Sequence, residues 1–175
     1  SYIKDLINSK DKSKKIISFD INSKKKIILV LLDQSITSSA SENLGAKFYE
    51  LFKNIKQKEF LINSDSISVK LNNFLGYFLL GIELKSYSFD KYKTKKNTKK
   101  ILILVTGKNK LALNIQNKFK AIKEGTFYTR DLVSEPGNIL HPDEYAKRIS
   151  LLKKDGLKIN IYDEKKLKKL GMHAL

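Results

Sequence analysis

Two pairs of carboxylates are the side chains in this sequence that come nearest to a pattern for metal or acid–base chemistry. Asp131 and Glu135 are four residues apart, so on a helix both carboxylates would lie on one face, where a metal ion could bridge them. Arg130 and neighbouring lysines favour a solvated or ion-paired role, so we interpret both carboxylates as groups that orient a helix end. Asp143 and Glu144 fall in the first turn of another predicted helix, where the helix dipole stabilises negative charge.

The remaining candidates for catalysis or metal binding form no recognisable motif. His141 and His173 lie far apart, and neither belongs to an HExxH or paired-histidine pattern. The sequence has no cysteine, which excludes a thiolate metal site, a disulfide and a cysteine nucleophile. No GxSxG motif surrounds a serine, and no glycine-rich stretch is followed by the GK[ST] of a phosphate loop. The residue pattern alone therefore predicts no catalytic residue and no metal ligand.

The net charge is the strongest signal in the composition. The 175 residues include 35 Lys and Arg against 18 Asp and Glu, and the formal net charge of +17 attracts anions such as nucleic acid or acidic lipid. Only Arg130 and Arg148 are arginines, although arginine is the residue that binds phosphate bidentately. We therefore interpret most of the charge as solvated lysine, in the manner of proteins from low-GC genomes.

One segment, residues 86–100, combines aromatic and basic residues. Tyr87, Phe89 and Tyr92 alternate with polar residues, and aromatic rings beside lysines can stack on the bases of a nucleic-acid strand. The other interpretation is a helix exit whose aromatic rings pack inward, followed by a solvated loop. The candidate nucleic-acid patch consists of Lys91, Lys93, Lys95, Lys96, Lys99 and Lys100.

Strand and helix patterns alternate along the chain. Apolar runs at 26–32 and 101–105 predict strands buried on both faces, as in a parallel sheet, and alternation at 157–162 predicts a third strand. Weaker strand patterns occupy 16–19 and 60–62. Apolar residues spaced by three and four predict helices over 38–56, 66–85, 111–135, 142–153 and 164–170. This order indicates an α/β fold with at least one mostly parallel sheet.

Local signals refine three of these helices. One of three serines around Ser39 can cap the first helix, and Glu42 stands at the capping-box spacing from Ser39. Asp163 is placed to cap the last helix. Gly76 and Gly81 lie inside the second helix, where each costs about 1 kcal/mol relative to alanine, so we predict that they allow close helix packing.

Nothing in the sequence predicts a membrane or a secreted protein. No apolar run reaches the roughly 18 to 20 residues of a membrane span, and the first residues are polar. A chain without cysteine is compatible with a reducing cytoplasm. Because the chain begins with Ser1 and not with Met, we expect a fragment excised from a longer protein.

Three blocks of the sequence match the pattern of one protein family. The first block matches at Arg130, Asp131, Leu132, Pro136, Asn138, Pro142 and Ala146, with Ser134 where Asn is usual. The second block matches at Asp163, Glu164, Leu167, Leu170, Gly171 and Met172. The third matches at Tyr87, Phe89, Asp90, Tyr92, Lys93 and Thr94. In these blocks the sequence resembles the leucyl (cytosol) aminopeptidases, a family of hexameric two-metal exopeptidases. The resemblance covers residues 70–175, whereas 1–65 match only in pattern.

The resemblance implies an organisation in three parts. Residues 1–107 would form a partial macro-like N-terminal α/β domain, a mostly parallel sheet flanked by helices, with its first strands missing. Residues 108–136 would form a long connecting helix, and 137–175 the first elements of the α/β catalytic domain. In the family, an early strand ends in a turn that contains glycine. This sequence has Asp33 at that place, which is a further departure from the family pattern.

The resemblance also implies a function for the parent protein. Such a protein hydrolyses the first peptide bond from a free N-terminus with two divalent metal ions, Mn²⁺ or Zn²⁺, and works as a cytoplasmic homohexamer. The family blocks that supply the metal ligands and catalytic residues, VGKG-x-x-FD-x-GG and NTDAEGR, do not occur in residues 1–175. We therefore expect no bound metal and no peptidase activity from this chain alone.

Two other interpretations of the chain's function remain open. Some members of the family bind DNA through the N-terminal region, so the chain could act as a basic DNA-binding module. It could also have a purely structural role, in which it positions the subunits of an oligomer. For the chain alone we expect mostly monomer or a weak dimer.

Overall fold

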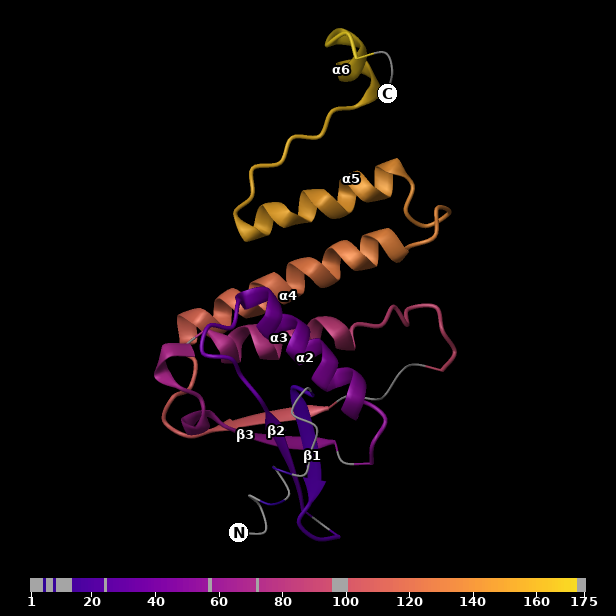
Figure 1. Ribbon diagram of the computed structural model, residues 1–175. Helices are drawn as coiled ribbons and strands as arrows, with labels where there is room; N and C mark the ends of the chain where they lie inside the picture. The colour runs from indigo at the N-terminus through magenta and orange to yellow at the C-terminus, as the bar shows by residue number, and fades with distance from the viewer. Residues whose placement is uncertain are drawn as a thin grey trace. The chain divides into compact units, whose positions relative to one another are not determined.

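The computed structural model describes residues 5, 8, 14–23, 25–56, 58–71, 73–95 and 101–172. The chain divides into two compact units, Ser1–Phe127 and Tyr128–Leu175 (Figure 1). The strands are β1 (Ile16–Asp20), β2 (Lys26–Val30), β3 (Glu59–Asn63) and β4 (Leu102–Thr106). The α-helices are α2 (Ser38–Phe52), α3 (Phe74–Ser86), α4 (Leu113–Ser134), α5 (Pro142–Ser150) and α6 (Glu164–Lys169). Short 3-10 helices are η1 (Ser64–Ser66), η2 (Val69–Leu71) and η3 (Leu151–Asp155).

The strands β1 and β2 form an antiparallel pair. Their register runs from Ile16 opposite Val30 to Asp20 opposite Lys26. The prediction that 26–32 forms a strand buried on both faces of a parallel sheet is therefore wrong. An apolar run carries no information on strand direction, and four of the five residues of β2 are only half-buried.

The strands β3 and β4 form a parallel pair, with Glu59 opposite Leu102 and Asn63 opposite Thr106. One face of this pair packs against the core, because Phe60, Ile62 and Ile103 contact the buried cluster. The other face is exposed, with exposed fractions of 67% for Leu61, 49% for Leu102 and 47% for Leu104. The parallel pairing follows the predicted α/β pattern, whereas the predicted burial of 101–105 on both faces is wrong.

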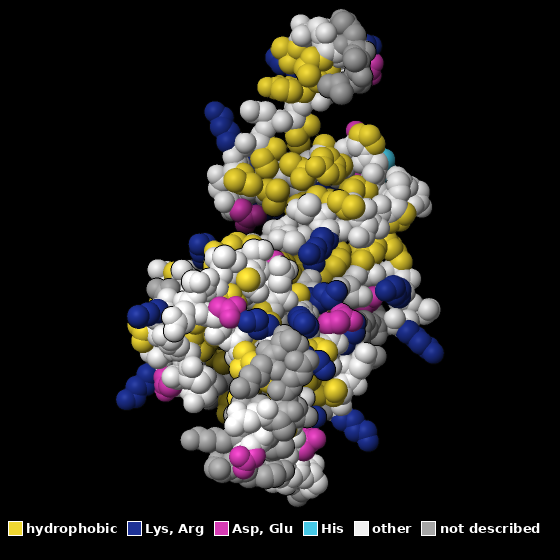
Figure 2. All heavy atoms as spheres, in the orientation of Figure 1, with side chains coloured by type: hydrophobic (Ala, Val, Ile, Leu, Met, Phe, Trp, Pro, Cys, Tyr) yellow, Lys and Arg dark blue, Asp and Glu magenta, His cyan; other side chains and the backbone are white. Residues whose placement is uncertain are grey.

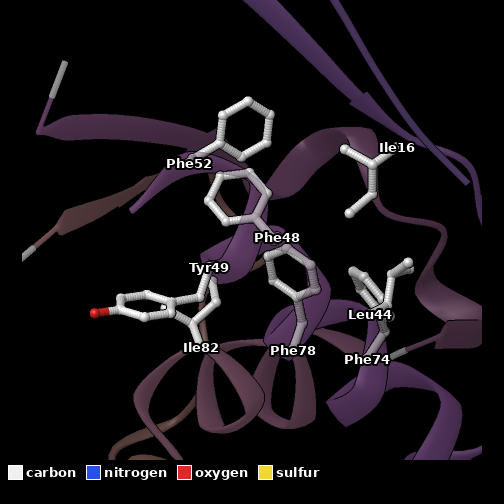
Figure 3. Packing of buried hydrophobic residues seen from close by; sticks show 8 residues of the cluster. All are labelled: Ile16, Leu44, Phe48, Tyr49, Phe52, Phe74, Phe78 and Ile82. Atoms are coloured by element: carbon white, nitrogen blue, oxygen red, sulfur yellow. The ribbon is translucent and has the colours of Figure 1, made fainter. Parts of the chain in front are cut away.

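The core of the first unit lies where α2 and α3 pack on each other and on the inner face of β3 and β4 (Figures 1 and 3). Phe48 is central to it and is only 4% exposed. Its ring centroid lies 4.8 Å from that of Phe52, 5.3 Å from Phe60 and 5.6 Å from Phe78, distances typical of favourable aromatic pairs. The buried cluster comprises Ile16, Leu44, Phe48, Tyr49, Phe52, Phe74, Phe78 and Ile82.

Glycines allow α2 and α3 to approach closely. A Cβ atom on Gly81 would overlap the backbone carbonyl of Glu42, and one on Gly45 would overlap that of Phe78. A Cβ on Gly76 would overlap the ring of Phe119 in α4. The prediction that the glycines of this segment serve helix packing is therefore confirmed.

Helix α2 begins at Ser38 as predicted but ends at Phe52, before the predicted residue 56, and its cap differs from the predicted one. Thr37, and none of the predicted serines, caps α2: its Oγ1 accepts a hydrogen bond from the backbone N–H of Ala40 at 3.1 Å. Ser41 Oγ instead donates to the carbonyl of Thr37 at 2.9 Å. The helix predicted from residue 66 begins only at Phe74, after the two short 3-10 turns η1 and η2.

The long helix predicted over 111–135 is observed as α4, and the helix after Pro142 as α5 followed by η3. Gly156 ends η3 with a φ of 84°, in the left-handed region that favours glycine. Asp163 caps α6, as predicted, because its Oδ1 accepts from the backbone N–H of Lys166 at 2.8 Å.

Residues 157–162 are extended but belong to no strand, so the strand predicted there is wrong. A strand needs a neighbouring backbone to satisfy its N–H and C=O groups, and none of the residues the structure describes pairs with this segment. Leu157, Ile161 and Tyr162 are each half or more exposed, at 55%, 50% and 51%.

Candidate functional site

In the second unit, Arg148 joins the end of α4 to α5. Its Nη1 donates to Glu135 Oε1 at 2.9 Å, and its Nε donates to Glu144 Oε1 at 2.9 Å. The backbone carbonyl of Arg148 accepts from the hydroxyl of Tyr128 at 2.9 Å. The side chain of Glu135 is only 2% exposed, whereas that of Arg148 is 21% exposed. Glu135 is therefore ion-paired, which is one of the roles expected from the sequence. The arginine that binds it is Arg148, from α5.

The ion pairs keep both partners charged. The hydrogen bonds that Arg148 donates to Glu144 and, to a smaller extent, to Glu135 raise the pKa of Arg148 above its usual value. The hydrogen bond from Arg148 lowers the pKa of Glu144, against an opposing effect of burial, and Lys147 adds a smaller favourable charge. Because these contacts stabilise the charged form of each partner, we interpret the cluster as one that positions helices.

The donor set for a metal is absent from the part of the chain that the structure describes. Within it, no three His, Asp or Glu side chains lie together in a way that could hold an ion. His141 occupies the N-cap position of α5 and makes no side-chain capping hydrogen bond. His173 lies outside the described residues. The described residues therefore do not fit a two-metal centre, and Glu135 is engaged by Arg148.

The predicted nucleic-acid patch is described in part. Lys91, Lys93 and Lys95 are exposed, whereas Lys96, Lys99 and Lys100 lie outside the described residues. Lys91 Nζ lies 5.4 Å from the ring centroid of Tyr92.

The aromatic residues of this segment pack on other rings. The ring of Tyr87 lies 5.1 Å from that of Phe127, and Phe89 lies 5.8 Å from Tyr92, between centroids. Tyr87 and Phe89 are half-buried and Tyr92 is 53% exposed. This packing favours the interpretation in which the aromatic rings turn inward, at least for Tyr87.

A pocket of about 560 Å³ brings lysines from three separate segments together. Lys53 stands at the C-terminal end of α2, Lys85 in the last turn of α3, and Lys93 in the segment that follows α3. The full lining is Tyr49, Lys53, Asn54, Lys85, Ser86, Tyr87, Ser88 and Lys93. Sequence analysis missed Lys53 and Lys85. The available signal was their shared position at the ends of two consecutive predicted helices.

Carboxylates hold these lysines in place. Glu50 binds two of them, with Oε1 at 2.7 Å from Lys53 Nζ and Oε2 at 3.5 Å from Lys85 Nζ. The hydrogen bond from Lys53 is the main cause of a lowered pKa at Glu50. Asp90 Oδ1 lies 2.9 Å from Lys93 Nζ, and the Asp90 side chain is only 15% exposed.

On the face shown in Figure 2 the basic side chains form no single patch. Figure 2 shows lysine and arginine side chains scattered over the visible face, several of them beside carboxylates. This pattern supports the interpretation of most lysines as solvated or paired side chains. Within the described ranges, none of the helices combines the length and the hydropathy required of a membrane span.

The fold of this chain occurs in solved structures of other proteins. No family model matches the chain. A structure of tomato leucine aminopeptidase aligns with 90% of this chain and 34% of its own, with a TM-score of 0.68 and 23% identity. The bottromycin maturation enzyme BotP, in complex with Mn, aligns with 89% of this chain and 34% of its own, with a TM-score of 0.66 and 19% identity. The chain therefore has the predicted α/β fold, that of the N-terminal region of leucine aminopeptidase.

Sequence relatives then give the family. A probable cytosol aminopeptidase of Phytoplasma mali (strain AT) is 36% identical over 159 residues, which are 86% of this chain and 32% of that protein. A probable cytosol aminopeptidase of Agrobacterium fabrum (strain C58) is 44% identical over 105 residues, 56% of this chain and 21% of that protein. The chain belongs to the cytosol (leucyl) aminopeptidase family and corresponds to its N-terminal region. It spans about a third or less of the length of these relatives.

Proposed function

We propose that the chain is the N-terminal part of a metal-dependent leucyl aminopeptidase that, as a whole, hydrolyses N-terminal amino acids from peptides. The observation that carries this proposal is the 36% identity over 159 residues with a probable cytosol aminopeptidase. Within the whole enzyme, residues 1–107 would be the N-terminal domain, 108–136 the connecting helix and 137–175 the start of the catalytic domain.

This chain contributes architecture and no catalytic group to that enzyme. The two divalent ions, Mn²⁺ or Zn²⁺, bind to residues that the remainder of such a protein supplies. One structural relative, BotP, forms a complex with Mn, which supports the use of a divalent ion. We also propose that the whole enzyme is a cytoplasmic homohexamer that acts on peptides with free N-termini, and the name of its relatives supports the cytosolic location.

A chimera tests this proposal directly. The matched third of the Phytoplasma mali relative is replaced by this chain, and release of leucine from leucine amide is measured with added Mn²⁺ or Zn²⁺. We expect metal-dependent hydrolysis by the chimera and none by the 175-residue chain alone. Turnover by the chain alone would contradict its structural role. A chimera that is folded by circular dichroism but inactive would contradict its membership of such an enzyme.

A second candidate function is nucleic-acid binding by the patch at residues 91–100. The net charge of +17 and the exposure of Lys91, Lys93 and Lys95 favour it. The affinity for duplex DNA is measured at several salt concentrations, because each phosphate contact steepens the salt dependence. The test variant replaces Lys95, Lys96, Lys99 and Lys100 by Ala. The control with the same change of charge replaces Lys153, Lys154, Lys165 and Lys169 by Ala.

A weaker affinity in the test variant than in the control would support a specific patch. Equal effects in both variants would show that the charge of the chain acts as a whole, and would contradict the patch.

A further inference from the structure

The pocket between the ends of α2 and α3 has the features of a site for a small anion. Three lysines, Lys53, Lys85 and Lys93, line one cavity of about 560 Å³. We propose that this pocket binds a small organic monophosphate of the size of a nucleoside monophosphate, with its phosphate among the three ammonium groups. The proposal goes beyond the aminopeptidase function and does not depend on it.

The lysines are held in position before any ligand arrives. Glu50 binds Lys53 and Lys85 through its two oxygens, so one carboxylate on α2 joins the ends of both helices. Asp90, largely buried, holds Lys93 in the same way. This pairing restricts Lys53, which is 32% exposed, more than Lys85 and Lys93, which are 49% and 61% exposed, and to that extent it reduces the entropy lost when a ligand binds.

The charge balance favours an anion. Three lysines and two carboxylates leave an excess of one positive side-chain charge, which the negative C-terminal ends of α2 and α3 oppose in part. Each ammonium has three N–H donors, and a carboxylate contact occupies only part of that capacity. Lysine also binds phosphate as a point charge, without the planar geometry that arginine requires.

A favourable interaction with the helix dipoles explains the positions of only two of the three lysines. Cations near a helix C-terminus interact favourably with its carbonyl groups, which would explain Lys53 and Lys85. Lys93, however, lies outside the described helices and lines the same cavity, with its ammonium paired to Asp90. A helix dipole therefore does not explain why Lys93 lies beside Lys53 and Lys85.

The size and the walls of the pocket indicate more than a free phosphate. Small-molecule sites commonly enclose about 300–1,000 Å³, and this pocket falls within that range. Tyr49 is 4% exposed, and its ring is fixed in the core while its hydroxyl oxygen points away from Phe48 and Phe78 (Figure 3). Tyr87 is fixed against Phe127. Tyr87, which is half-buried, therefore offers the organic part of a ligand a ring to pack on, whereas Tyr49 is too enclosed to offer more than its edge.

Binding is tested on the whole 175-residue chain by NMR titration of its amide signals. The probes are adenosine monophosphate, adenosine and inorganic phosphate. We expect saturable shifts with adenosine monophosphate at amides of residues 49–54 and 85–93. We also expect adenosine to bind at least tenfold more weakly, because it lacks the phosphate.

Matched variants test the role of the lysines. Lys85→Gln and Lys93→Gln should each weaken adenosine monophosphate binding by about tenfold, since each removes one of three charges around the phosphate. The control is Lys120→Gln on α4, which also removes an exposed, carboxylate-paired lysine (3.9 Å from Glu124) but does not line the pocket. It should bind as the unmodified chain does, and all three variants should keep the same circular dichroism spectrum.

Three results would overturn the proposal. The first is the absence of saturable shifts with adenosine monophosphate at 10 mM, on the order of the weakest affinity expected of a specific site. The second is an equal loss of binding in Lys120→Gln, which would show an effect of total charge. The third is displacement of the nucleotide by a single-stranded oligonucleotide that itself binds a hundredfold more tightly, which would assign the pocket to a nucleic-acid strand.

Discussion

Glu135 and Arg148 form a hydrogen-bonded ion pair in which the acid is almost completely enclosed. The Glu135 side chain is 2% exposed, and its Oε1 accepts a hydrogen bond from Arg148 Nη1 at 2.9 Å. A carboxylate removed from water needs a positive partner, because burial disfavours the charged form. The pair therefore fixes the end of α4 against α5 and defines the turn between them.

Replacing Glu135 by Gln should loosen this turn. The amide keeps the shape of the carboxylate but loses its charge, and Arg148 then retains Glu144 as its ionic partner. We expect amide hydrogen exchange in α5 to accelerate by about tenfold, since local opening loses one charge-assisted hydrogen bond. The control is Glu164→Gln, whose carboxylate pairs with Lys168 at 2.6 Å while 81% exposed. A surface pair of this kind contributes little, so equal acceleration in both variants would contradict the prediction.

The Arg148 contact should also be visible in an acid titration. The pKa of Glu144 lies below its ordinary value of 4.5, mainly because Arg148 hydrogen-bonds the carboxylate. A group whose pKa is lowered on folding stabilises the fold above the unfolded pKa, and this contribution is lost as the pH falls through the lower folded value. We expect the NMR titration midpoint of Glu144 to fall below 4.5 and to rise toward it in Arg148→Met. A midpoint that does not respond to this substitution would exclude Arg148 as the cause.

Substitution of the packed glycines should separate crowding from helix propensity. Gly81→Ala should lower the free energy of unfolding by about 1–3 kcal/mol, because the new methyl group overlaps the Glu42 carbonyl. Gly125→Ala is the control: it lies inside α4 with nothing within 4 Å of an added Cβ. There alanine should stabilise the chain by about 0.5–1 kcal/mol through its higher helix propensity. Urea unfolding followed by circular dichroism measures both, and a stabilising Gly81→Ala would show that α2 and α3 can separate without loss.

The helices could be predicted from the sequence because their information is local. The three-and-four spacing that includes Leu44, Phe48 and Phe52 marks the face of α2 that is buried, and Asp163 caps α6 where its residue type predicts. Thr37 was missed as the cap of α2 because several serines nearby satisfy the same local rule. Only the backbone conformation at the helix start selects among them.

Strand partners and the pocket could not be predicted in the same way, because they depend on residues distant in sequence. The run at 26–30 has the same hydropathy whether it pairs in parallel or antiparallel, and its antiparallel partner, β1, is a separate segment of the chain. Residues 157–162 have a strand pattern without a partner among the described residues. Lys53 and Lys85 belong to different helices, and only the packing of α2 on α3 brings them to one cavity.

The aromatic core makes a final prediction about what holds the first unit together. Phe48 is 4% exposed and packs its ring against Phe52, Phe60 and Phe78, so it joins α2 to both α3 and β3. Phe48→Ala should lower the free energy of unfolding by about 3–5 kcal/mol, the usual effect of removing a buried phenyl ring and leaving a cavity.

Because a loss of that size can unfold a small protein, Phe48→Leu serves as a second variant, with an expected loss of about 1–2 kcal/mol. Leu51→Ala is the control on the same helix, since Leu51 is 50% exposed, and it should change the free energy of unfolding by less than about 1 kcal/mol. Urea unfolding measures all three. If Leu51→Ala lowered the free energy of unfolding as much as Phe48→Leu does, burial would not determine the loss of stability. That result would contradict the central role of Phe48.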